Sequence, residues 1–365
     1  MKIIKILFAF LVLGLIAVSA LSYWMYSSLN TSHAHGKASE YVKIEKGSTP
    51  REIIAKLAAD GILPGELPTL IYLKTMGDAS KLQAGEYQFA SPISPLQVLK
   101  TLEKGEDRTT KLTIPEGFTR FDIAKRLANW SVHRPDSQAI METSDFAEKR
   151  ILALMDDTTL IRDISPEAKN LEGYMYPSTY VLDSSSTPEK LIKTMVEQFR
   201  KIWKPEWAAQ AKSLGRTPHE IVTIASLIET ETGVESERPV VAGIINNRLS
   251  KNIPLGIDQT NVYIAKMMNR WDGVINKSDL EVDSPYNTRI KTGIPPGPIS
   301  SVSESSIKAA LFPTPNDYIY YVRNVELNDG SHWFYASASE FEKGKAKYQQ
   351  WLEKERQEKR GEGNN

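Results

Sequence analysis

One carboxylate stands among small side chains in this sequence, in a pattern that suits proton transfer. Within residues 221–233, Glu229 follows Ala225 and Ser226 by four and three positions and precedes Thr232 by three. On a helix these positions share one face. Small neighbours leave room for a bulky ligand above the acid, and a glutamate so placed can act as general acid and base. The pattern alone also fits an ordinary exposed helix glutamate, so Glu229 is a candidate catalytic residue.

Polar segments after Glu229 indicate a class of ligand. Residues 246–263 and 284–288 are rich in Asn, Gln, Thr, Tyr and Asp and are expected mainly on loops. Sugar hydroxyls pair well with neutral hydrogen-bonding groups, and sugar rings stack on aromatic faces, so this composition favours a sugar-binding groove. The residues expected to bind the substrate are Ser226, Thr232, Asn247, Arg248, Asp258, Gln259, Tyr286, Asn287 and Thr288.

Helices are expected to position the candidate acid. The apolar periodicity predicts helices over residues 191–203 and 218–232. Gly233 is a typical residue for ending the second helix. Glu229 is therefore expected in the last helical turn, beside the loops that carry the polar residues.

A repeat organises the region before these helices. The pattern of residues 44–53 recurs seventy positions later, in residues 114–123. Each copy reads as a short strand, a glycine turn and a helix that starts at a threonine cap, Thr49 or Thr119, with an acid three residues later. Together with a further strand and helix, the first copy predicts a compact βααβ module over residues 41–105.

The N-terminal segment predicts the compartment. Residues 6–26 carry no charge and are mostly Leu, Ile, Val, Phe and Ala. As a helix they are long enough to span the hydrocarbon core of a bilayer. Lys2 and Lys5 precede the segment, which predicts a cytoplasmic N-terminus, and Tyr23 and Trp24 suit the far interface. A cleaved signal peptide is the alternative; both interpretations place the rest of the chain outside the cytoplasm.

Composition excludes several other classes of protein. Lys plus Arg and Asp plus Glu are 45 each, a balance that argues against a nucleic-acid-binding protein. The hydrophobic content of 41% is too high for a disordered chain. The sequence contains no cysteine, which excludes disulfides and thiol nucleophiles. Walker, dinucleotide-binding and His-Glu-x-x-His motifs are absent, so no metal or other cofactor is expected.

Several short motifs lie between residues 171 and 334 of the sequence. They are LEGYMYPSTY (171–180), ASLIETET (225–232), INNRL (245–249), YNT (286–288), GIPPGPI (293–299) and GSHWF (330–334). Through these motifs and its overall organisation, the chain resembles the YceG-like (MltG) family of endolytic murein transglycosylases. In that family the first glutamate of the Glu-x-Glu-Thr block is the catalytic acid, which maps onto Glu229. The module at 41–105 resembles LysM modules, which bind glycan strands that contain N-acetylglucosamine; a small α+β spacer is the alternative.

The resemblance implies non-hydrolytic cleavage of MurNAc–GlcNAc β-1,4 bonds in nascent peptidoglycan strands, which ends strand elongation. Glu229 is expected to protonate the glycosidic oxygen and then to accept the proton of the C6 hydroxyl, which closes on C1 to give a 1,6-anhydro end. The implied partners are peptidoglycan glycan strands and penicillin-binding synthases. The implied location is the bacterial inner membrane, with a single pass and the catalytic domain outside the cytoplasm.

Two alternatives to this function stay open. A retaining hydrolase needs a second carboxylate roughly 5–5.5 Å from the first, and the candidates are Asp258, Glu231, Glu235 and Glu237. A protein of another class, a non-catalytic murein-binding scaffold that recruits synthases, could use the same module and groove.

The expected fold is α+β, with an N-terminal transmembrane helix. The expected parts are a cytoplasmic start and anchor (1–27), a linker (28–40), the LysM-like module (41–105), a mixed α+β catalytic domain (106–345) and a C-terminal helix end with a polar tail (346–365).

Overall fold

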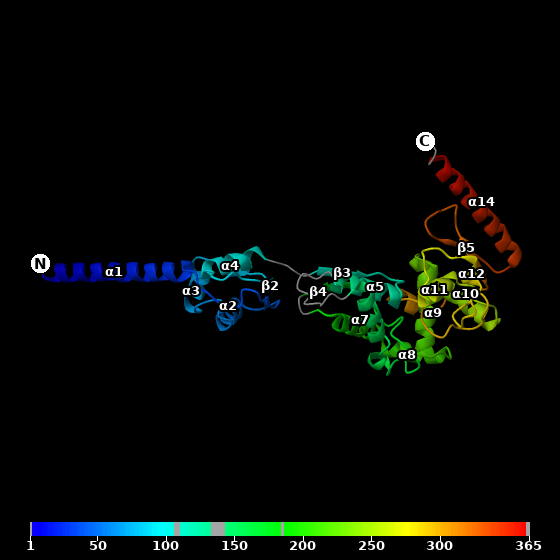
Figure 1. Cartoon of the computed structure of the whole chain (residues 1–365), viewed down its shortest axis with the longest axis horizontal. Coiled ribbons are helices and arrows are strands. Elements are labelled where there is room, and N and C mark those ends of the chain that lie inside the picture. Colours follow the sequence, from blue (N-terminus) through cyan, green and yellow to red (C-terminus); the bar gives the residue numbers. More distant parts are fainter. Residues whose placement is uncertain (1, 106–109, 133–142, 184–185, 363–365) are drawn as a thin grey trace. The chain divides into compact units, whose positions relative to one another are not determined.

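The computed structural model contains two compact units built from helices and short strands (Figure 1). Unit 1 comprises Met1–Lys111 and Val181–Ser185, and unit 2 comprises Leu112–Tyr180 and Ser186–Asn365. The named strands form two-stranded sheets, so the predicted mixed α+β class is confirmed. The residues that the structure describes are 2–105, 110–132, 143–183 and 186–362.

The chain begins with a long apolar helix, α1 (Lys2–Asn30). Its segment Phe10–Asn30 is, within the described residues, the one helix long and apolar enough to cross a membrane. Large apolar side chains along it are exposed, as at Leu13. The helix also contacts α3 (Leu67–Thr75) and α4 (Pro95–Lys104) of the same unit.

A small sheet and three helices form the remainder of unit 1. Strand β1 (Val42–Ile44) pairs antiparallel with β2 (Gly85–Tyr87). Helices α2 (Pro50–Ala59) and α3 lie between these strands in sequence, and α4 follows β2. The LysM-like module expected over residues 41–105 stays a prediction. The core side chains include Ile54, Leu57, Tyr87, Val98, Leu99 and Leu102.

Both copies of the sequence repeat form the predicted helix cap. Thr49 Oγ1 accepts a hydrogen bond from Glu52 N at 3.3 Å at the start of α2. Thr119 Oγ1 accepts one from Asp122 N at 3.2 Å at the start of α5 (Arg120–Val132). The same local chemistry therefore starts a helix in each unit.

The segment predicted as a linker, residues 28–40, is held on unit 1. His33 N donates to the carbonyl oxygen of Ile93 at 2.8 Å, and His35 N donates to Ser91 Oγ at 2.9 Å. These contacts attach part of the segment that its composition predicted to be a linker.

Unit 2 is organised around helix α9 (Pro218–Glu231), whose residues 221–229 are buried. Its helical neighbours are α8 (Pro205–Ser213), α10 (Arg238–Ser250), α11 (Asp258–Met267) and α13 (Glu304–Leu311).

Further strands and helices lie elsewhere in the chain. The strands are β3 (Thr110–Ile114), β4 (Ser178–Leu182), β5 (Tyr320–Arg323) and β6 (His332–Tyr335). The helices are α6 (Ser144–Leu154), α7 (Pro188–Ile202) and α12 (Lys277–Leu280), and the short 3-10 helices are η1 (Ala79–Lys81), η2 (Thr159–Ile161) and η3 (Glu235–Glu237).

The C-terminal helix α14 (Ala338–Glu362) is longer than the sequence pattern suggested. It continues through most of residues 346–365, which were predicted as a helix end and a polar tail. This segment is rich in Glu, Lys, Arg and Gln, which are good helix formers, and Lys354 pairs with Glu358 one turn later at 3.9 Å. The high helical propensity of these residues explains why α14 extends further than its apolar residues alone predicted.

Candidate active site

Glu229 lies in the last turn of α9, and both ends of this helix are fixed. At the start, Thr217 Oγ1 accepts from Glu220 N at 3.2 Å, and the Glu220 carboxylate accepts from Thr217 N at 2.9 Å, which forms a capping box. At the end, Thr232 has an extended backbone and closes the helix. The predicted helix over 218–232 is confirmed, and Glu229 has a defined position in it.

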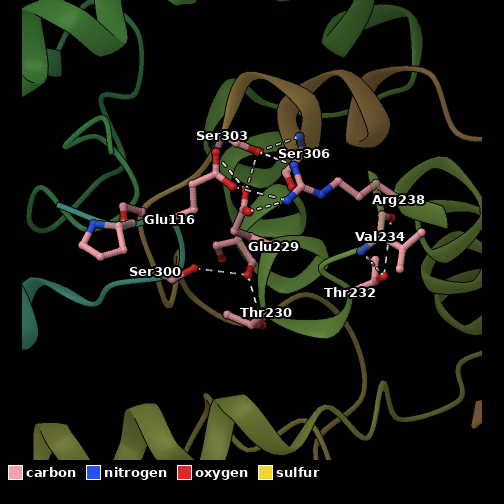
Figure 2. Close-up of polar contacts among 12 residues, drawn as sticks. Glu116, Glu229, Thr230, Thr232, Val234, Arg238, Ser300, Ser303 and Ser306 are labelled. Atoms are coloured by element: carbon pink, nitrogen blue, oxygen red, sulfur yellow. Dashed lines mark hydrogen bonds and ion pairs between the residues drawn. The ribbon is translucent and has the colours of Figure 1, made fainter. Parts of the chain in front are cut away.

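The Glu229 carboxylate is surrounded by hydrogen-bond donors, and its side chain is only 2% exposed. Arg238 Nη2 donates to Oε1 at 2.8 Å. Ser303 donates to Oε2 twice, from its backbone N at 2.8 Å and from Oγ at 2.6 Å. Figure 2 shows these three residues converging. A cation on one oxygen and two neutral donors on the other compensate the cost of burying the carboxylate.

The two residues that hold Glu229 are themselves fixed. Ser303 caps α13, because its Oγ accepts from Ser306 N at 3.2 Å. Arg238 Nη1 donates to Ser303 Oγ at 2.7 Å. Further back, Ile299 N donates to Ser226 Oγ at 3.0 Å, which ties the segment leading to Ser303 to helix α9. The carboxylate is therefore preorganised by α9, α10 and the start of α13.

A cleft of about 760 Å³ lies directly beside this cluster. Arg238 and Ser303 form part of its wall, and the buried Glu229 side chain lies behind them. The volume is in the range of small-ligand sites. The wall also contains aromatic and charged side chains, which suit the ring faces and hydroxyl groups of a sugar. These side chains include Glu116, Tyr176, Trp207 and Lys308.

Glu116 is a second carboxylate of this cleft. Its Oε2 lies 3.5 Å from Nη2 of Arg238, the same nitrogen that contacts Glu229. Partial burial and the negative charge of Glu229 raise the pKa of Glu116, while the Arg238 guanidinium acts in the opposite direction. The site thus contains two carboxyl groups that share one cation.

Four of the residues predicted to bind substrate are buried and bonded inside the protein. Ser226 Oγ donates to a carbonyl oxygen of its own helix at 2.7 Å, and Thr232 Oγ1 donates to the Glu237 carboxylate at 3.1 Å. Asn287 Nδ2 donates to two backbone carbonyl oxygens. Thr288 Oγ1 accepts from a backbone N–H at 3.0 Å. These side chains hold helix ends and loops in place.

The other five predicted binding residues have different surroundings. Asn247 and Arg248 donate to backbone carbonyl oxygens in the segment before β5. Asp258 pairs with an arginine, Gln259 is exposed, and Tyr286 is partly buried against another tyrosine ring. Within the described residues, none of the nine predicted binding residues lines the cleft beside Glu229. Their contact with a substrate stays a prediction.

The carboxylates considered as second acids also have other partners. Glu231 accepts a hydrogen bond from Tyr321 Oη, and burial raises the pKa of Glu231. Glu237 Oε2 lies 2.8 Å from His332 Nδ1. Glu235 alone among these candidates lines the cleft.

Sequence patterns missed Glu116, Arg238 and Ser303. Glu116 occupies the repeat position that Lys46 holds in the first copy, and this change of charge is the one local signal for it. Arg238 follows η3 and starts α10 beside a proline, a position that carries no chemical signature by itself. Ser303 is separated from Glu229 by 74 positions.

A metal site has no support from side-chain clustering in the part of the chain that is described. There, no group of three or more His, Asp or Glu residues could hold an ion.

A buried glutamate lies behind a polar cleft in an α+β unit. The family model of the YceG-like family matches residues 42–347, and the chain belongs to that family. It is 31% identical to the endolytic murein transglycosylase of Bacillus subtilis over 338 residues, 88% of each chain. It is also 31% identical over 327 residues to the endolytic murein transglycosylase of Streptococcus pneumoniae, and this match covers 83% of the chain but 57% of the relative.

The chain is also similar to a solved structure. The crystal structure of a YceG-like protein from Listeria monocytogenes has a TM-score of 0.53 and 29% identity, and the match covers 83% of this chain and 97% of that one.

Proposed function

We propose that this protein is an endolytic peptidoglycan lytic transglycosylase with Glu229 as its catalytic acid and base. The activity named for the two bacterial relatives supports the proposal. The observation that carries it is the placement of Glu229, a preorganised carboxylate immediately behind the wall of a cleft of about 760 Å³. The substrate is the MurNAc–GlcNAc β-1,4 bond of nascent glycan strands.

One carboxylate is enough for this reaction because the nucleophile belongs to the substrate. Protonated Glu229 gives its proton to the glycosidic oxygen as the bond to C1 of MurNAc breaks. The 2-acetamido group of the substrate supports the oxocarbenium-like centre. Glu229, now ionised, accepts the proton of the C6 hydroxyl as O6 bonds to C1. The proton count of the enzyme is restored, no water is consumed, and the new end is a 1,6-anhydro sugar that terminates the strand.

Arg238 and Ser303 stabilise the ionised form of Glu229 that occurs in this cycle. Arg238 neutralises Oε1, and the backbone N–H of Ser303 remains on Oε2 in every side-chain rotamer. Rotation of Ser303 about its Cα–Cβ bond removes the Oγ donor and opens Oε2 toward the cleft, which Ser303 also lines. This rotation gives the glycosidic oxygen access to a carboxylate that is otherwise covered.

Helix α1 supplies the membrane anchor in this proposal. Phe10–Asn30 has the length and apolar surface of a spanning helix. Lys2 and Lys5 precede it and favour a cytoplasmic N-terminus, which puts the chain after α1 on the outer side of the inner membrane. An anchored enzyme acts on strands close to the membrane, where penicillin-binding synthases extend them, so these synthases are the proposed partners.

The module at residues 41–105 is the proposed glycan-holding part. Its βααβ order supports the LysM-like interpretation, in which the module binds N-acetylglucosamine-containing strands. Binding here would keep the enzyme on its polymeric substrate between cleavage events.

The test uses the full-length protein in detergent with purified sacculi, followed by mass spectrometry of released fragments. We expect 1,6-anhydro ends from the parent protein and none from Glu229→Gln, because the amide cannot donate the proton. Glu231→Gln is the matched control: it lies in the same helical turn, and its amide oxygen still accepts from Tyr321, so anhydro products should persist.

Other outcomes would contradict the proposal in different ways. Products with free reducing ends indicate a hydrolase. Intact sacculi that retain the protein indicate a murein-binding scaffold. Activity that survives in Glu229→Gln removes Glu229 from the catalytic role.

A further inference from the structure

The loop that carries Glu116 is fastened to the segment that carries Ser303. Gly117 N donates to the carbonyl oxygen of Ser301 at 3.1 Å, and Ser301 N donates to that of Phe118 at 2.7 Å. Ser301 Oγ adds a bond to the Phe118 carbonyl oxygen at 3.0 Å. These backbone bonds join residues far apart in sequence, so Glu116 is held beside the Glu229 cluster by the fold.

Glu116 and Glu229 face the same guanidinium nitrogen. Arg238 Nη2 is 2.8 Å from Glu229 Oε1 and 3.5 Å from Glu116 Oε2. One positive charge cannot neutralise two carboxylates, and adjacent carboxyl groups favour a state in which one of them keeps a proton. Burial and the negative charge of Glu229 raise the pKa of Glu116, and the Arg238 guanidinium opposes this shift.

The two carboxyl groups differ in their access to the cleft. The Glu229 side chain is 2% exposed, whereas that of Glu116 is 55% exposed and forms part of the cleft wall. Figure 2 shows Glu116 approaching the Glu229, Arg238 and Ser303 cluster from its own loop. Glu116 therefore connects the buried acid to the space where a substrate binds.

We propose that Glu116 is the proton-holding partner of Glu229, and that the two carboxyl groups share one proton before and after each cleavage. The inference rests on the function proposed above. Before cleavage the pair carries one proton, which passes from Glu116 to Glu229 and from Glu229 to the glycosidic oxygen. The pair is then fully ionised and stabilised by Arg238. The proton of the C6 hydroxyl returns to Glu229 as O6 bonds to C1, and the pair again holds one proton.

Other charged groups border this pair and must be considered in its titration. Tyr176 lines the same cleft, and burial and the charges of Glu304 and Glu116 raise its pKa. Glu235, Glu304 and Lys308 line the same cleft. Glu304 is bonded to Lys308 at 2.8 Å, so these two charges largely cancel. The shared guanidinium of Arg238 stays the nearest cation to both carboxyl groups.

The experiment is the pH dependence of kcat/KM for release of anhydro-ended fragments from sacculi by full-length protein. In the parent, the pair keeps its proton to a higher pH than a lone glutamate does. Glu116→Gln removes the second carboxyl group, so the basic limb of the profile should move to lower pH by about one unit, with about tenfold lower kcat/KM above that limb. Activity in acid should stay within about threefold of the parent, on the order of 0.7 kcal/mol.

Two further variants separate proton holding from a structural role. Glu116→Asp keeps a carboxyl group and should return the basic limb toward its parental position. Glu235→Gln removes a different carboxylate of the same cleft and should leave the position of the limb unchanged. Thermal melting of each variant checks that unit 2 is folded.

The results that overturn the inference are distinct from those that overturn the function. Proton sharing is refuted if the basic limb of the kcat/KM profile of Glu116→Gln lies at the same pH as in the parent. It is also refuted if Glu116→Gln melts like the parent but loses activity at every pH. A parent that releases no anhydro products, or a Glu229→Gln variant that still releases them, refutes the proposed function itself.

Discussion

Replacing Arg238 with methionine tests whether the Glu229 site depends on a buried ion pair. The two side chains are 8% and 2% exposed, so the change leaves a buried carboxylate without its cation. Removing one partner of such a pair costs about 3–5 kcal/mol. Because the two Ser303 donors remain, we expect the lower value, about 3 kcal/mol. For a unit of this size, that corresponds to a fall in the melting temperature of roughly 6–12 °C.

Thermal melting of full-length protein in detergent, followed by near-UV circular dichroism, measures this fall. In the double variant Glu229→Gln, Arg238→Met the carboxylate charge is also removed, so the double variant should melt above the single one. Arg200→Met is the control, because its pair with Asp163 is exposed and is worth less than about 1 kcal/mol. If Arg238→Met melts like Arg200→Met, or if the double variant is no more stable than the single one, the ion pair does not hold the site.

Two further predictions concern the segment before β4. Burial raises the pKa of Glu172 to about 8, so its contribution to stability is complete below its unfolded pKa and is lost as the pH rises through about 8. Glu172→Gln should therefore raise the melting temperature at about pH 9 relative to the parent but not at about pH 5; an equal effect at both pH values contradicts this. Gly173 has a φ of +81°, and an added Cβ would lie 2.6 Å from Pro298 Cβ. Gly173→Ala should cost more than about 1 kcal/mol in melting experiments, and Gly233→Ala, with no atom within 4 Å of its added Cβ, should cost less.

Local signals in the sequence were sufficient for the elements that carry the site. The caps at Thr49 and Thr119 and the helix over 218–232 depend on residues within a few positions of each other, so their chemistry can be recognised without a structure. The small neighbours of Glu229, one turn away along the same helix, made it a candidate, and its catalytic role stays a prediction.

Contacts between distant segments could not be recognised in this way. Ser303 is 74 positions from Glu229, and Glu116 is 122 positions from Arg238. Nothing near any of these residues indicates that the chain brings them together. The buried Asn287 shows a related difficulty: its amide donates to backbone carbonyl oxygens, and the same group is equally suited to a sugar hydroxyl. Residue type alone does not distinguish these two partners.

The most direct test of the central claim is cleavage of sacculi in water enriched in heavy oxygen, with mass spectrometry of the new glycan ends. If the C6 hydroxyl of the substrate attacks C1 while Glu229 shuttles the proton, the new MurNAc ends contain no solvent oxygen and are one water lighter than reducing ends. Incorporation of one heavy oxygen atom at each new end would show that water is the nucleophile and would contradict attack on C1 by the C6 hydroxyl of the substrate.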